Sequence, residues 1–190
     1  MGFLDTLLGR TKPVPPNLDN LFSLPGAALT LEAGTDFRPT GTGSVCFRAA
    51  EGRAFSDIEK DVRQLLAMGD DKKPVQASRD SFGFTWLVCR HDPGDPEGLV
   101  TDLHAVNSSL ELGGFGPQLL CTIMAFRNSE NRSLGLVYLY KRGTFYPFAP
   151  QGGERRDNAL ELQIRGTLGA DLKIEPDLGR WFPVWGAPGL

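Results

Sequence analysis

The residues best suited to chemistry lie close together in the middle of the chain. Cys89 and His91 are two positions apart at the end of an apolar run. Alternation along a strand would place both side chains on one face, so a small metal site can be drawn with the residues that follow: Asp92, Asp95, Asp102 and His104. The spacing matches no established zinc pattern, and ordinary loop-surface positions explain His91 equally well. We assign no metal ligands here, and a metal-dependent regulator or enzyme using Cys89 and His91 stays an alternative.

Two other kinds of chemistry find little support in the sequence. The chain has no GxSxG nucleophile elbow, and neither of its 2 histidines stands in a context that marks a partner base for Ser or Cys. The string PTGTGSVCF lacks the Gly-Lys-Ser/Thr ending of a phosphate-binding loop and leads into a strand rather than a helix. We therefore predict no catalytic or cofactor-binding residues, and a protein that is not an enzyme.

Composition narrows the class of protein further. The 190 residues carry a net charge of −3 and include 41% hydrophobic residues, which is ordinary for a globular domain in water. No basic run is long enough to attract a nucleic acid, and neither a spanning segment nor a secretory signal is recognisable. The cysteines at 46, 89 and 121 show no CxxC spacing and are expected to be buried, small hydrophobes. These features predict a cytoplasmic protein that does not bind nucleic acid.

Helices and strands must position these residues, and the spacing of apolar residues along the chain predicts most of these elements. We expect helices over 17–24, 55–69, 96–112 and 157–168, and seven strands over 28–32, 44–48, 74–79, 82–90, 118–127, 133–141 and 144–148. The segment 34–43 is expected to be a loop. The segment 157–168 also alternates like a strand, but Asp157 as a cap and Gly169 as a stop favour a helix.

The order of these elements indicates the fold class. Strands that arrive in hairpins favour an antiparallel sheet, here of about seven strands, with helices packed against it. We therefore predict an α+β fold in which residues 17–190 form a single domain.

The N-terminal residues form a separate apolar segment. Residues 1–12 carry a hydrophobic stripe if helical, and residues 13–16 form a Pro-rich connector. The stripe consists of Phe3, Leu4, Leu7 and Leu8. Burying four such side chains contributes at most roughly 6–12 kcal/mol, whereas ordering eight residues costs about 8–16 kcal/mol. We expect at most weak peripheral membrane contact, and docking of this segment on its own domain or on a partner.

The C-terminal residues are unusually aromatic. Trp181, Phe182 and Trp185 fall within a Pro-broken segment that cannot form a long helix. Such a segment could fold back over an open face of the sheet, or it could be a docking patch for another protein. We predict that it is a strap whose aromatic side chains are mainly buried.

Four stretches together resemble a known family: MGFLDTLLGRTKP, GSVCFRAAEG, RRDNALELQIR and EPDLGRWFPVWGAPGL. The chain is similar over its full length to the PspA-associated protein PspAB family of actinobacteria. The resemblance implies a link to PspA, the membrane-remodelling protein of the phage-shock envelope-stress response, and it supplies no catalytic residues. The expected function is a non-catalytic cytoplasmic accessory protein that acts through protein–protein contacts, with PspA or another envelope-stress component as partner. A small-molecule-binding domain is the alternative, and the oligomeric state is left open.

Overall fold

The computed structural model describes residues 16–48, 56–57, 60 and 75–190. The predicted N-terminal stripe and most of the predicted helix over 55–69 lie outside these residues. The helical elements are η1 (Leu18–Ser23), α2 (Leu24–Thr35), α4 (Pro96–Leu110), η2 (Glu111–Phe115), η3 (Gly116–Gln118), α5 (Asn158–Leu168) and η4 (Leu178–Arg180). The strands are β1 (Arg38–Arg48), β2 (Gln76–Arg79), β3 (Phe84–Arg90), β4 (Leu119–Arg127), β5 (Ser133–Leu139) and β6 (Thr144–Phe148).

The strands form one antiparallel sheet in the order β2-β3-β1-β4-β5-β6. Helices pack against it, which confirms the predicted α+β class, but the described sheet has 6 strands rather than about seven. β6 is an edge strand, a position that tolerates Pro147 because proline cannot donate a ladder hydrogen bond. A short stretch of the C-terminal segment runs beside β6, where the Phe145 amide donates to the Lys173 carbonyl at 2.9 Å and the Glu175 amide donates to the Phe145 carbonyl at 2.7 Å.

The prediction of a strand over 28–32 was wrong, because these residues lie inside α2. From the sequence alone, the Pro25-Gly26 pair predicts the end of a helix. Pro25 instead occupies the first turn of α2, where its missing N–H has no intrahelical partner to lose. Four small or aliphatic side chains then recur at helical spacing on the buried face: Leu24, Ala27, Ala28 and Leu31.

The predicted loop over 34–43 was also wrong for most of its length, because α2 continues to Thr35 and β1 already begins at Arg38. The glycines in this stretch allow close approach of other parts of the chain. A side chain at Gly41, whose φ is +72°, would meet the His91 carbonyl oxygen at 2.3 Å, and one at Gly43 would meet Leu103 at 2.7 Å. The register between β1 and β4 shifts between Pro39 and Gly43, so this end of the strand is irregular.

The other predicted elements that fall on described residues are confirmed with changes at their ends. The hairpin β2-β3, the strands β4 to β6 and the helices α4 and α5 all occur where periodicity placed them. Asp95 and Asp157 cap α4 and α5 as expected, because their side chains accept from the amides of Gly98 and Leu160. The predicted helix over 17–24 is the 3-10 helix η1, capped by Asn17.

The two faces of the sheet are covered differently. The larger core lies between the sheet and α2, α4 and α5. The opposite face is covered by the C-terminal segment, defined here as residues 173–190, which crosses the strands without regular structure apart from η4. The candidate site lies on this second face.

Within the part of the chain that the structure describes, no helix is long and apolar enough to cross a bilayer.

Candidate functional site

A pocket opens between the second face of the sheet and the C-terminal segment. Its volume is about 660 Å³, within the range typical of small-molecule sites. Buried side chains of the sheet line its floor, and residues 180 and 182–185 of the C-terminal segment form one wall. Exposed side chains at its mouth include Phe82 and Phe182, which are 52% and 58% exposed.

The floor of the pocket is built by cross-strand pairing. Cys46 of β1 lies opposite Trp86 of β3 on one side and opposite Cys121 of β4 on the other. Cys121 in turn lies opposite Leu139 of β5. Because side chains alternate along each strand, this row of four points toward the C-terminal segment while neighbouring residues such as Phe47 point into the helical core. Strand register therefore brings together residues that are far apart in the sequence.

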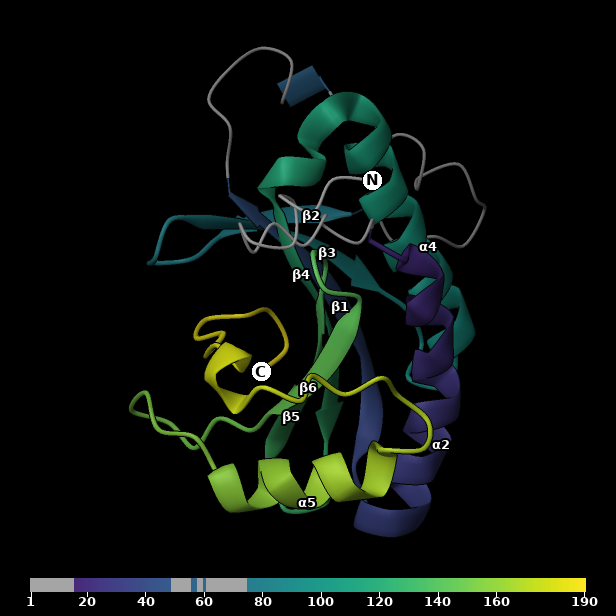
Figure 1. Ribbon diagram of the computed structural model, residues 1–190, viewed down its shortest axis with the longest axis vertical. Coiled ribbons are helices and arrows are strands. Elements are labelled where there is room, and N and C mark those ends of the chain that lie inside the picture. Colours follow the sequence, from purple (N-terminus) through teal and green to yellow (C-terminus); the bar gives the residue numbers. More distant parts are fainter. Residues whose placement is uncertain (1–15, 49–55, 58–59, 61–74) are drawn as a thin grey trace, which may run out of the picture.

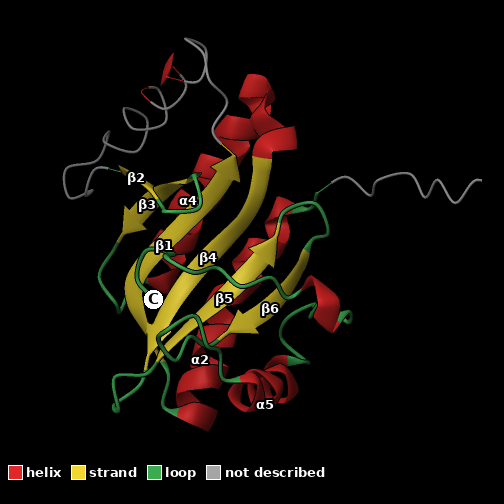
Figure 2. Cartoon of the chain, turned by 90° about the vertical axis from the view of Figure 1, so that its left-hand side faces the viewer, coloured by secondary structure: helices red, strands yellow, loops and turns green. Residues whose placement is uncertain are grey.

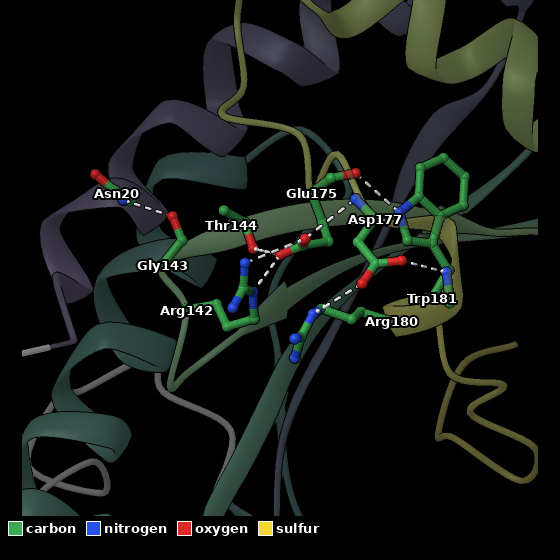
Figure 3. Close-up of polar contacts among 9 residues, drawn as sticks. Asn20, Arg142, Gly143, Thr144, Glu175, Asp177, Arg180 and Trp181 are labelled. Carbon is green, nitrogen blue, oxygen red and sulfur yellow. Dashed lines mark hydrogen bonds and ion pairs between the residues drawn. The ribbon is translucent and has the colours of Figure 1, made fainter. Parts of the chain in front are cut away.

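The wall of the pocket is held in place by the buried carboxylate of Glu175. Arg142 donates to it through Nε at 2.6 Å and through Nη2 at 3.4 Å, and the Thr144 hydroxyl donates at 2.7 Å (Figure 3). The amide of Asp177 donates to the same carboxylate at 3.2 Å. Burial raises the pKa of Glu175, but these hydrogen bonds outweigh burial and hold its pKa below the usual value of 4.5. The C-terminal segment is thus pinned to the turn between β5 and β6.

Trp181 provides the second anchor of the C-terminal segment. Its indole Nε1 donates to the Glu175 carbonyl at 3.0 Å (Figure 3). Its ring stacks on Tyr146 with the ring centroids 5.9 Å apart. The Tyr146 hydroxyl donates to the Phe182 carbonyl at 2.7 Å, and Arg156 donates to the Trp181 carbonyl at 2.6 Å. The segment is therefore a fixed wall of the pocket.

The charges around the pocket are mainly positive. Among the described residues, its lining contains the basic residues Arg48, Lys141, Arg142 and Arg180 and a single acidic one, Asp80. The carboxylate of Asp80 accepts from the amides of Phe82 and Phe84, each at 2.9 Å, and from the Trp86 indole at 2.8 Å. It therefore serves mainly to close the β2-β3 turn. A chain with a net charge of −3 thus carries a locally cationic site.

The two thiols on the floor interact with each other. The hydrogen bond between Cys46 and Cys121, together with burial, raises the pKa of Cys46 well above the usual range. A thiol that stays protonated is a poor nucleophile, so the Cys46 side chain behaves as a soft apolar group at neutral pH.

The residues first singled out for chemistry hold two elements together. The ring nitrogens of His91 lie 2.9 Å from Asp95 and 2.7 Å from Asp102, so His91 joins the end of β3 to α4. Cys89 belongs to the helical core. Across the residues with a described placement, no group of three or more His, Cys, Asp or Glu side chains is arranged to hold a metal ion.

The predicted aromatic strap is seen, but its side chains differ. Trp181 is 5% exposed, Trp185 is half-buried against the edge of Phe148, and Phe182 points outward. The pocket itself was not predicted from the sequence. Alternation in β1 and β4 does signal that Cys46 and Cys121 share one face, but the pairing that makes them neighbours has no local signature.

Comparison with known proteins identifies a family but no individual relative. Neither the search of curated proteins nor the search of solved structures gave a match. The family model for PspAB, described as PspA associated protein B, matches residues 1–189. This match covers nearly the whole chain and agrees with the family that the sequence segments indicated. The chain therefore belongs to the PspAB family of PspA-associated proteins.

Proposed function

We propose that this protein is a non-catalytic accessory protein of the PspA-linked envelope-stress response, acting in the cytoplasm through protein–protein contacts. The observation that carries the proposal is the family match over residues 1–189, whose description links the family to PspA. The partner is PspA itself or another component of the same response.

The use of polar side chains in the described structure supports a non-catalytic role. His91 with its two aspartates joins β3 to α4, and Glu175 with Arg142 fixes the C-terminal segment. In both clusters the side-chain hydrogen bonds go to neighbouring elements of the fold. Groups committed in this way stabilise the structure instead of turning toward a substrate.

The N-terminal stripe is the part of the chain that we propose to meet the partner. It consists of Phe3, Leu4, Leu7 and Leu8. An amphipathic segment of this kind suits docking into a groove on another protein, and it is too short to hold a membrane strongly.

Affinity purification of tagged PspA from a native lysate tests the proposal. The tag is placed on PspA so that both ends of this chain stay unmodified. We expect the chain to co-purify with PspA or with another stress component, and deletion of residues 2–12 to reduce its recovery with little change in thermal stability. Phe182→Ala serves as a control for loss of an exposed aromatic group elsewhere. Repeated recovery of neither PspA nor any other stress component with the intact chain would contradict the proposal.

A further inference from the structure

The pocket beneath the C-terminal segment combines an apolar interior with a cationic mouth. We propose that it binds a single-chain amphiphile with an anionic head, namely a free long-chain fatty acid. This inference goes beyond the protein-contact function and does not depend on it.

The interior of the pocket suits a hydrocarbon chain. Its floor is formed by Trp86, Cys46 and Cys121, all of which are at most 6% exposed. The Cys46 thiol stays protonated at neutral pH, and Cys121 beside it is also buried, so the two side chains present soft apolar surface. Leu120 and Leu139 extend this surface along the sheet. A cavity of about 660 Å³ holds one ligand of drug size, so we commit to one free chain and not to a two-chain phospholipid.

The mouth of the pocket suits a carboxylate. Arg142 and Arg180 are already paired with acids, Arg142 with Glu175 and Arg180 with Asp177. Arg48 and Lys141 are exposed, and neither forms an ion pair with any residue whose position the structure describes. These two cations can therefore receive an anionic head without breaking an existing pair.

The apolar interior and the cationic mouth of the pocket together define the proposed pose of the fatty acid. The hydrocarbon chain lies between the cross-strand row of the floor and the wall made by Val184 and Trp185. The carboxylate stays near solvent, between Arg48 and Lys141. Phe82 and Phe182 flank the mouth and shield the first methylenes from water.

Quenching of tryptophan fluorescence by bromine-labelled stearate tests where the chain binds. Two of the 3 tryptophans, Trp86 and Trp185, line the pocket, so a bound brominated chain should quench much of the emission with a saturable curve. Unlabelled palmitate should reverse the quenching. Quenching that never saturates, or that begins only where the fatty acid forms micelles, would overturn the proposal.

Calorimetric titration of the full chain tests both ends of the ligand. From laurate to palmitate, affinity should rise by up to about fourfold for each buried methylene. Hexadecanol, which lacks the charge, and hexadecylamine, which reverses it, should each bind at least about tenfold more weakly than palmitate. Equal binding of the cationic and anionic chains would contradict the assigned mouth. Binding to anionic vesicles but not to palmitate would show that the basic residues meet a membrane surface instead.

Variants then test the assigned residues. The double variant Arg48→Glu with Lys141→Glu should weaken palmitate binding by about tenfold or more. Arg155→Glu is the matched control, because Arg155 is exposed and outside the pocket lining, and it should bind like the unmodified chain. Leu120→Trp should fill the pocket and abolish binding, provided that its melting temperature shows a folded protein. Full affinity in the folded double variant would refute the proposal, whatever the outcome for Leu120→Trp.

Discussion

Replacement of Trp181 by alanine tests whether the C-terminal segment is part of the folded core. The side chain is only 5% exposed, and truncation of a buried tryptophan costs about 3–5 kcal/mol of unfolding free energy. Its stacking on Tyr146 and its hydrogen bond to the Glu175 carbonyl place the expected loss toward the upper end of that range. For a chain of 190 residues, this loss corresponds to a decrease in melting temperature of roughly 6–20 °C.

The neighbouring residue provides a matched control. Phe182 is 58% exposed, so Phe182→Ala should change the unfolding free energy by no more than about 0.5 kcal/mol. Both variants can be measured by thermal and urea unfolding followed by circular dichroism. A Trp181→Ala variant as stable as the unmodified chain would show that the C-terminal segment does not pack on the sheet as described. A large loss on Phe182→Ala would equally show that the two aromatics are assigned the wrong way round.

Three further predictions concern titratable groups. Glu175→Gln should lower the unfolding free energy at neutral pH, and this loss should shrink as pH falls below about 4.5, because a lowered carboxyl pKa stabilises the fold only while the group is ionised. Urea unfolding of both chains across pH measures the difference. Burial raises the pKa of Tyr138 and of Tyr140 to about 12, so phenolate absorbance from these groups should be missing at pH 10 in the folded chain. The unfolding free energy should fall as pH rises from 10 to 12, because these groups ionise more readily in the unfolded chain. The Cys46 thiol should react with iodoacetamide far more slowly in the folded chain than in urea; equal rates would contradict its raised pKa.

Much of the fold could be predicted because local signals agree with the tertiary structure. α4 begins at an Asp-Pro pair and keeps its buried residues on one face, so capping and periodicity point to the same helix. The same agreement places α5, where the Asp157 cap decides between two periodicities.

The errors arose where one residue type has two physical roles. Proline can end a helix or occupy its first turn, and only packing of α2 on the sheet distinguishes the two for Pro25. Glycine can indicate a loop or allow close approach in a strand, and at Gly41 the approaching group is the backbone of His91, fifty residues away in sequence.

The candidate site was the least predictable part, because it depends on long-range pairing. The alternation that turns Cys46 toward the second face can be seen in the sequence, but the register that sets it between Trp86 and Cys121 cannot. The aromatic C-terminal segment was identified as a cover for the sheet, yet the volume left beneath it depends on how Glu175 and Trp181 anchor it.

Titration of the fluorescently labelled full chain with purified PspA from the same organism measures the proposed contact itself. We expect a saturable binding curve that is weakened by deletion of residues 2–12 and unchanged by Phe182→Ala. The absence of saturable binding by a chain that melts cooperatively would contradict direct contact with PspA.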